Sequence, residues 1–412
     1  MHVHVIHPSE LGAVEIAAWH AMQRATPSLA NPFLSPEFAI AVGRFRPESR
    51  VGVLSDGQSV MGFFPFEKRQ FGVGVPISGW LSPCQGLVHA PGAEWDPREL
   101  LQHCRLTTWK FDNLIPAQKP FAPFHAYTDP APVIDLSGGF EAYYATLRAK
   151  SPKFCRELER KARKLDREVG ELNALNASQD LDVLRTLIAW KSDQYRNTDH
   201  VDRFGHAWIV NLLETLLATQ TDYLSSELSV LYAGKEPVAA QLGLRAGPLV
   251  VGWFTGYDAS YSSYSPGLIQ LMRLAEGVAA TGATMIHMGK GAQKYTQGIK
   301  TGDVFVSQGA VTSRSVLGTA HRARNAIARW ALLSARQHPI LHDIADTILR
   351  HSGLSSRTYG RVLAGGAGRM NSPSNSTTRK SSNERETGWN ATGVKPSSCS
   401  TSIILVMRGC PV

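Results

Sequence analysis

The stretch that decides the fold is LVVGWFTGYDASYSSYSPGLIQLMRLAEGVAATGATMIHMGK, at residues 249–290. It opens with an apolar, aromatic run typical of a buried strand, and a polar loop follows at 258–264. Residues 266–281 then repeat apolar side chains with the spacing of an amphipathic helix. A second short apolar run lies at 285–288. The expected order is therefore strand, loop, helix, strand.

The start of the expected helix has the chemistry of an anion site. Ser265 suits the N-cap, and Pro266 suits the first helical position, where its missing N–H costs nothing. Gly267 and Leu268 are then expected to present free backbone amides at the positive end of the helix, which binds phosphate well. The same triplet also begins ordinary buried helices, so both interpretations stay open on these residues alone.

Length and composition indicate a globular protein of two or three domains. The chain has 412 residues, of which 43% are hydrophobic and 19% charged. No segment offers the roughly 18 uninterrupted apolar residues of a membrane span, and the first residues lack the basic and apolar regions of a secretory signal. The five cysteines are scattered without a CxxC pair. We therefore expect a reduced, cytoplasmic protein without a structural metal.

The basic residues are concentrated in one segment. A net charge of +9 and a pI near 9.3 are compatible with nucleic acid, anionic lipid or an anionic cofactor as a partner. Much of the basic density lies in residues 148–167, where Glu157 to Lys161 and Glu159 to Arg163 have the i,i+4 spacing of helical ion pairs. This interleaving favours a solvated helix face over nucleic-acid binding.

The order of elements indicates two similar α/β lobes. One hairpin around an Asp-Gly turn is expected at 51–64, and a second around a Gly-Lys turn at 228–244. Each hairpin follows a helical segment, at 36–45 in the first lobe and at 208–219 in the second. A strand at 131–136 is expected to lead from the first lobe into the second.

The predicted domains are an N-terminal lobe at 1–135, a C-terminal lobe at 136–315, a helical extension at 316–364 and a tail at 365–412. The tail is rich in Ser, Thr, Asn and Arg and is expected to be disordered, because it cannot bury enough apolar surface to fold. The N-terminal lobe has no counterpart of the Ser-Pro-Gly triplet. A phosphate site is therefore expected in the second lobe only.

Several groups of residues together resemble a known family. The order of residues 261–267, Glu276, Gly282, 288–291 and 294–295 is similar to the acetyltransferase domain of CelD-like proteins of bacterial cellulose biosynthesis, in the GCN5-related N-acetyltransferase (GNAT) superfamily. The upstream features that agree are 151–153, 190–191 with 194–196, and 31–33 with 35–36. The resemblance covers about residues 30–315 and is strongest from 145 to 300.

The resemblance implies tandem GNAT-like lobes, each a mixed, mainly antiparallel sheet flanked by helices. It also implies acetyl-CoA or another acyl-CoA as co-substrate, held between a splayed fourth strand at 249–257 and fifth strand at 285–288, with its pyrophosphate on the loop at 263–268. The residues expected to bind it are Phe254, Thr255, Ser263, Tyr264, Ser265, Gly267, Leu268 and Lys290. The loop departs from the superfamily signature Gln/Arg-x-x-Gly-x-Gly/Ala, because it keeps one glycine and contains a proline.

Three residues are candidates for proton transfer. The resemblance makes Tyr295 the first choice for the acid that protonates the departing thiolate, although a packing role suits it equally. Asp258 and His287 are base candidates by position, but Asp258 also suits a turn and His287 a core strand. The residues expected to bind the acceptor are Trp190, Lys191, Gln194, Tyr195 and Gln241. The first four share one helical face, and their aromatic members also suit core packing.

The predicted function is acyl-CoA-dependent N-acylation of an amine on a sugar, a lipid-linked sugar or a peptide. The resemblance adds a role in polysaccharide biosynthesis. Two alternatives stay open: a FemAB-like aminoacyltransferase that uses aminoacyl-tRNA, favoured only by the basic run, and a non-catalytic scaffold that keeps the fold.

Overall fold

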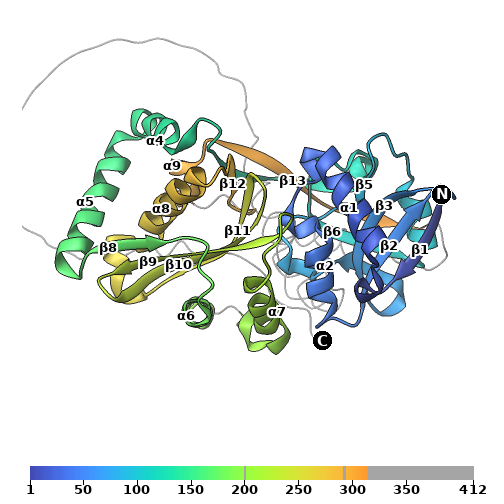
Figure 1. The fold of residues 1–412 in the computed structure, drawn as a ribbon, viewed down its shortest axis with the longest axis horizontal. Helices are drawn as coiled ribbons and strands as arrows, with labels where there is room; N and C mark the ends of the chain where they lie inside the picture. The colour runs from blue at the N-terminus through green and yellow to red at the C-terminus, as the bar shows by residue number, and fades with distance from the viewer. Residues whose placement is uncertain (199–200, 291–293, 314–412) are drawn as a thin grey trace, which may run out of the picture. The chain divides into compact units, whose positions relative to one another are not determined.

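The computed structural model describes residues 1–313 except 199–200 and 291–293. The helical extension and the tail expected from the sequence lie outside the described residues. The strands join in a single sheet of order β1-β2-β3-β4-β6-β13-β7-β12-β11-β10-β9-β8, with β5 paired to β3 (Figure 1). No helix in the part of the chain that the structure describes is long and apolar enough to cross a membrane.

The first lobe contributes one half of this sheet. Its strands are β1 His2–Ile6, β2 Ser49–Ser55, β3 Val60–Lys68, β4 Val73–Pro76, β5 Val88–His89 and β6 Thr108–Leu114. Its helices are α1 Ala13–Ala25, α2 Pro36–Gly43 and α3 Pro97–His103. The hairpin expected at 51–64 is confirmed as β2 and β3, whose turn contains Gly57 at a φ of +100°, a conformation that glycine adopts without strain.

The second lobe contributes the other half. Its strands are β8 Leu172–Leu175, β9 Ser225–Ala233, β10 Glu236–Ala246, β11 Leu249–Tyr257 and β12 Met285–His287. Its helices are α4 Gly139–Lys150, α5 Pro152–Glu168, α6 Leu181–Arg196, α7 Ala207–Leu217, α8 Pro266–Ala280 and α9 Lys294–Ile299. The strand, loop, helix, strand order expected over 249–290 is confirmed as β11, the 3-10 turn Ala259–Tyr264, α8 and β12.

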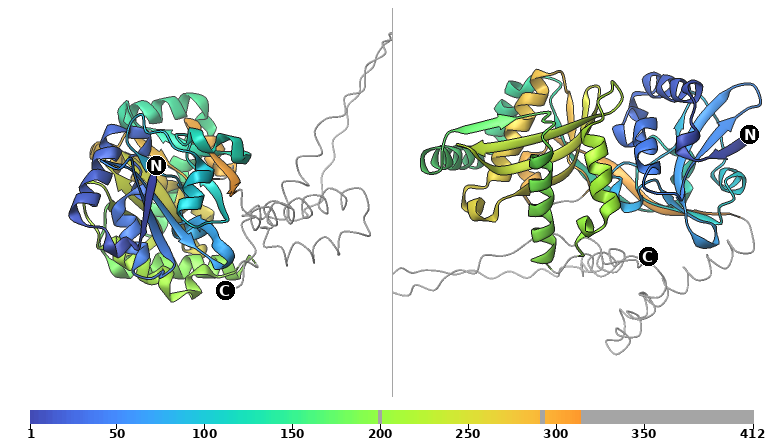
Figure 2. Two further views of the ribbon diagram at one scale, coloured as in Figure 1. Left: turned by 90° about the vertical axis from the view of Figure 1, so that its right-hand side faces the viewer. Right: turned by 60° about the horizontal axis from the view of Figure 1, so that its bottom comes forward.

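Helices cover both faces of the second half-sheet. Helix α8, together with α4 and α5, packs one face around a core that includes Leu231, Val250 and Ile286. Helices α6 and α7 pack the opposite face, where Leu228 and Leu242 are fully buried. The views in Figures 1 and 2 show α6 and α7 on the side of the strands away from α8. Side chains that alternate along a strand therefore enter two different cores.

The two lobes exchange their last strands. β7 His125–Asp135 follows the first lobe but pairs with β12 of the second, and β13 Gly302–Thr312 follows the second lobe but pairs with β6 of the first. β7 and β13 also pair with each other, antiparallel. The sheet order is therefore palindromic about the β7–β13 pair. In each half only the fourth and fifth strands, β4–β6 and β11–β12, run parallel.

Candidate acyl-CoA cleft

β11 and β12 separate after three residue pairs. Their parallel pairing joins Leu249, Val250 and Val251 to Met285, Ile286 and His287, whereas β11 continues to Tyr257. On its other side β11 stays paired to β10, but the register shifts because Leu242 opposes Phe254 while Gly243 opposes Gly252. Trp253 is thus the extra residue of a β-bulge, a feature that bends a strand and increases its twist. The bulge lies next to the point where the two strands diverge.

Helix α8 begins beside the far end of β11. Ser265 occupies the N-cap position in the left-handed region, at φ 56° and ψ 50°, and its side chain caps no amide. The expectation of a side-chain cap is therefore wrong. The Leu268 amide, expected to be free, donates to the Ser265 carbonyl at 3.0 Å. Among the described residues the Gly267 amide has no hydrogen-bond acceptor, so it keeps the expected role.

Gly267 has space around its Cα. A Cβ built there would meet Tyr257 Cδ1 at 3.5 Å, an ordinary van der Waals distance, and its backbone is not left-handed. A small substitution at this position is therefore compatible with the helix end. The position can be probed without disturbing the fold.

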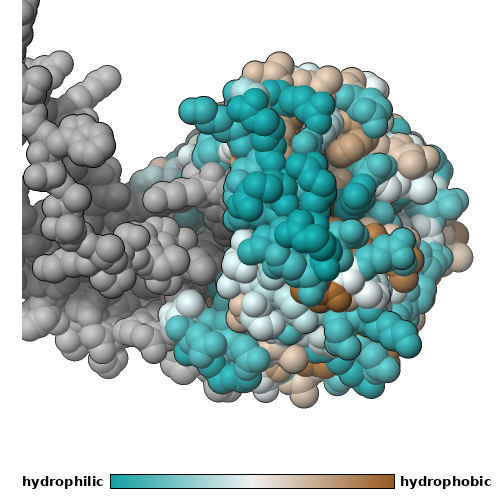
Figure 3. Space-filling view, turned by 90° about the vertical axis from the view of Figure 1, so that its left-hand side faces the viewer, coloured by the Kyte–Doolittle hydropathy of each residue, from teal (hydrophilic) through white to brown (hydrophobic). Residues whose placement is uncertain are grey.

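A cation from α5 reaches the same helix end. Lys161 Nζ donates to Ser265 Oγ at 2.8 Å, and Lys164 Nζ lies 5.3 Å from the centre of the Tyr264 ring. The Tyr264 hydroxyl in turn donates to Glu168 Oε2 at 2.9 Å. From the side that α5 occupies in Figure 1, the surface is largely hydrophilic (Figure 3). The i,i+4 pattern of this helix indicated only a solvated face, so the role of Lys161 was missed from the sequence.

The other expected cofactor residues divide by orientation. Phe254 is buried against Phe204, with ring centroids 5.2 Å apart, so its side chain packs on the face that α6 and α7 cover. Thr255 pairs with Gln241 of β10. Their neighbours in sequence, Phe254 and Leu242, pack against α6, and side chains alternate along a strand, so Thr255 and Gln241 point to the opposite face. Ser263 is exposed. Gln241 therefore lies on the face that α8 covers and not with the acceptor residues of α6.

Lys290 is held in the interior. Its Nζ donates to the Asp112 carbonyl at 2.6 Å and lies 3.4 Å from Asp129 Oδ2. Both side chains of this ion pair are 8% exposed. A buried ion pair of this kind orders the junction between the lobes, and it leaves Lys290 poorly placed to bind a phosphate.

The three candidates for proton transfer fare differently. Asp258 Oδ1 accepts from the amide and the hydroxyl of Ser260, at 2.8 and 2.7 Å, so this carboxylate shapes the turn after β11. Burial lowers the pKa of His287 to about 4, and its Nδ1 accepts the Gly289 amide at 3.2 Å. The neutral ring then carries its proton on Nε2, so this nitrogen is a hydrogen-bond donor. This protonation state argues against His287 as the general base. The side chain of Tyr295, in α9, lies outside the described residues.

The expected acceptor residues of α6 lie on one cluster. Lys191 Nζ donates to Gln194 Oε1 at 2.7 Å and lies 5.2 Å from the centre of the Tyr195 ring. Trp190 packs against β11, because a Cβ at Gly256 would be 3.4 Å from Trp190 Cβ. The structure thus brings four of the five expected residues together. It also adds Arg203, whose place in this cluster no sequence spacing indicated.

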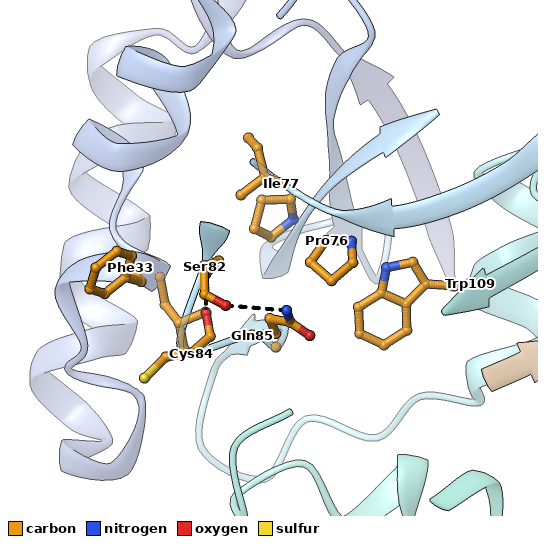
Figure 4. Close-up of a pocket in the computed structure, with 10 residues that line it drawn as sticks. Phe33, Pro76, Ile77, Ser82, Cys84, Gln85 and Trp109 are labelled. Carbon is orange, nitrogen blue, oxygen red and sulfur yellow. Dashed lines mark hydrogen bonds between the residues drawn. The ribbon is translucent and has the colours of Figure 1, made fainter. Parts of the chain in front are cut away.

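The corresponding position in the first lobe is filled. β4 pairs with β6 only through Val73 and Gly74, and Gln85 then lies against the end of β6, forming a bridge with Leu114. Gln85 Oε1 also accepts the amides of Asp112 and Asn113, at 2.9 and 3.0 Å. A small cavity remains beside Gln85, and it is lined mainly by apolar side chains (Figure 4). In the first lobe Gln85 therefore occupies the place next to the end of β6.

The thiol of Cys84, next to Gln85, is not expected to act as a nucleophile. Burial raises the pKa of Cys84 to about 12, so it stays protonated at neutral pH. Within the described residues no group of three or more His, Cys, Asp or Glu side chains is placed to hold a metal ion.

Residues 152–297 match the family model of the acetyltransferase (GNAT) domain. This match lies within the second lobe. The match contains the bulged strand, the start of α8 and most of the acceptor cluster. The expected fold class, two tandem GNAT-like lobes of mixed, mainly antiparallel sheet, is confirmed. The more specific assignment to CelD-like proteins stays a prediction.

Solved structures with this kind of fold are only distantly similar. FemX has a TM-score of 0.48 at 10% identity, covering 70% of this chain and 94% of that chain. The C-terminal domain of a putative lysylphosphatidylglycerol synthetase from Agrobacterium fabrum has a TM-score of 0.43 at 12% identity, covering 74% and 95%. A tandem GNAT protein from the clavulanic acid biosynthesis pathway has 0.43 at 9%, covering 75% and 98%. No curated protein matches the sequence.

Proposed function

We propose that this chain is an acyl-CoA-dependent N-acyltransferase whose GNAT lobe binds the co-substrate between β11 and β12. The observation that carries the proposal is the bulge at Trp253, next to the point where these strands diverge. Among the described residues, the edge of β11 that faces β12 has no strand partner beyond Gly252. It can pair with the amides of an extended, peptide-like ligand.

The phosphate groups would lie at the start of α8. The Gly267 amide and the positive helix end attract an anion. Lys161, now bonded to Ser265, adds a full charge at the same place. This cation offsets the loss of the second glycine in the loop, because a charged donor forms a stronger hydrogen bond than a neutral amide.

When bound, an acyl-CoA supplies a thioester whose carbonyl an amine can attack. Backbone amides at the bulge would polarise that carbonyl. Tyr295 remains our candidate for the group that gives a proton to the sulfur, since α9 follows β12 directly. We assign no general base, because Asp258 and His287 are both engaged in local hydrogen bonds.

We further propose acetyl as the acyl group and an amine on a sugar, a lipid-linked sugar or a peptide as the acceptor, in a CelD-like role in polysaccharide biosynthesis. These finer assignments rest on the sequence resemblance. Aminoacyl-tRNA is the second candidate for the donor, because α5 is strongly basic. The bond from Lys161 to Ser265 favours a compact phosphate ligand at α8.

The cofactor site can be tested at Gly267. We expect Gly267→Asp to abolish acetyl-CoA binding in calorimetry, because its carboxylate would occupy the phosphate position, while the melting temperature stays within a few degrees. Gly267→Ala is the matched control, since the structure has room for a Cβ. Unchanged acetyl-CoA affinity in folded Gly267→Asp protein would remove the basis for the site. Transfer activity that ribonuclease abolishes would instead favour aminoacyl-tRNA.

A further inference from the structure

Two cations, Lys191 and Arg203, meet between α6 and the first lobe. Lys191 is 8% exposed, and the nearby Arg203 is partly buried. The Tyr195 ring lies beside both, with its centre 5.2 Å from Lys191 Nζ and 5.6 Å from the Arg203 guanidinium carbon. On its other side Arg203 stacks on Trp80, at 4.0 Å from the ring centre. In the described part of the chain neither cation forms an ion pair.

The donors of these cations are mostly unused. Lys191 forms one hydrogen bond, to Gln194, and among the described residues Arg203 forms none. Stacking engages the face of the guanidinium and leaves its N–H groups in plane, available for a bidentate anion. On the lobe-one side, Asp112 acts electrostatically on Arg203, but its carboxylate accepts a hydrogen bond from Gln85 Nε2 at 2.6 Å. The site therefore has an excess of positive charge.

This arrangement is costly unless something compensates it. Burial disfavours each charge, and the field of Arg203 further lowers the pKa of Lys191, which falls to about 8. Two neighbouring like charges withdrawn from water destabilise a fold when no anion pairs with them. A bound anion would supply both the missing charge and the missing acceptors.

The cluster lies along the diverging half of β11. Phe204, the residue after Arg203, packs on Phe254, and Trp190, the residue before Lys191, packs on Gly256. This is the face of β11 opposite α8. An anion held here would be close to the acyl end of a ligand that enters from α8, but separate from its phosphates.

We propose that Arg203 and Lys191 bind an anionic group of the amine acceptor, so the GNAT lobe prefers an acceptor that carries a carboxylate or a phosphate near its amine. The identification of the anion as part of an amine acceptor rests on the proposed function. The anion site itself stands on the geometry of the cluster. Trp80 from the first lobe would form the opposite wall, which gives that lobe a part in substrate selection.

Direct binding tests the site without any turnover. Inorganic phosphate and acetate are titrated calorimetrically in the Gly267→Asp background, which removes phosphate binding at α8. We expect Arg203→Gln to weaken anion binding by about tenfold or more, and Arg203→Lys to retain most of it. Arg185→Gln, which removes an exposed cation from α6, the helix that carries Lys191, is the control and should bind like the parent protein. Equal affinity of Arg203→Gln and its parent, both folded, overturns the proposal.

Acceptor pairs then identify the anion. Glucosamine 6-phosphate is compared with glucosamine, and glycine with glycinamide, by thiol release from acetyl-CoA. We expect the charged member of at least one pair to have the lower KM in wild type, and Arg203→Gln to remove that difference. Preference for the neutral member of both pairs overturns the proposal. If wild type binds anions but not acetyl-CoA, the proposed donor fails while the anion site stands.

Discussion

Replacing Lys191 with methionine should make the protein more stable and a weaker binder of anions. Methionine keeps the length and apolar stem of lysine, so the packing around α6 is preserved. What disappears is an ammonium group that is 8% exposed and has no carboxylate partner among the described residues. Sites built for a ligand often lower the stability of the empty protein, and this substitution measures that cost directly.

The magnitude follows from the pKa of Lys191. Burial and the charge of Arg203 lower it from 10.5 to about 8. A difference of about 2.5 pKa units corresponds to about 3 kcal/mol spent on keeping the ammonium charged in the folded state. The variant also loses the hydrogen bond to Gln194, which lowers its stability by about 1 kcal/mol. We therefore expect Lys191→Met to raise the free energy of unfolding at pH 7 by about 1 to 2 kcal/mol, and the melting temperature by a few degrees.

The pH dependence provides a second check on the same residue. Between pH 8 and 10.5 the unfolded chain holds the Lys191 proton and the folded protein does not. The free energy of unfolding contributed by this residue therefore rises with pH across that window, and the rise should be missing in Lys191→Met. Urea denaturation at pH 7, 8, 9 and 10 measures both effects. A variant that is less stable than wild type at pH 7, with the wild-type pH slope, would refute the reasoning.

Two further predictions concern the acid and the exchanged strands. Tyr295→Phe should lower kcat by roughly 10²-fold with little change in acetyl-CoA affinity, because a proton donor to the leaving thiolate acts in the transition state; wild-type turnover at every pH would assign Tyr295 a packing role. A chain that ends at Thr301 should fail to fold, because it lacks β13, which pairs with both β6 and β7. A soluble truncated protein with a cooperative, wild-type-like melting transition would contradict this.

Local elements were predictable because local sequence specifies them. The apolar run that begins at Leu249 and the Ser-Pro-Gly triplet predicted a strand and a helix that begin where the structure has them. The Asp-Gly and Gly-Lys turns likewise identified both hairpins. The exchange of β7 and β13 was not predictable, because an apolar strand carries no mark of which partner it pairs with. The predicted boundary at 135 follows the chain, whereas the strand pairing crosses it.

The site was predictable where backbone chemistry defines it and not where partners meet through space. Gly267 was found because a glycine after Ser-Pro leaves an accessible amide. Lys161 was missed because the i,i+4 spacing predicted an ion pair with Glu157. Only the packing of α5 on α8 brings the Lys161 ammonium to Ser265. Arg203 lies in a loop without periodicity, so nothing local distinguishes it from a surface arginine.

The pseudo-twofold sheet also shows where two similar lobes differ in structure. Each half has parallel fourth and fifth strands that diverge, but in the first half Gln85 fills the divergence by pairing with the end of β6. The loop that carries Gln85 also contains Trp80, on which Arg203 stacks. In the same loop the Leu81 carbonyl accepts a hydrogen bond from Trp253 Nε1 at 2.8 Å. The loop that carries Gln85 thus also contacts the bulge of the second lobe. The exchanged strands join the two lobes, because β13 pairs with β6 of the first lobe and with β7, which pairs with β12 of the second.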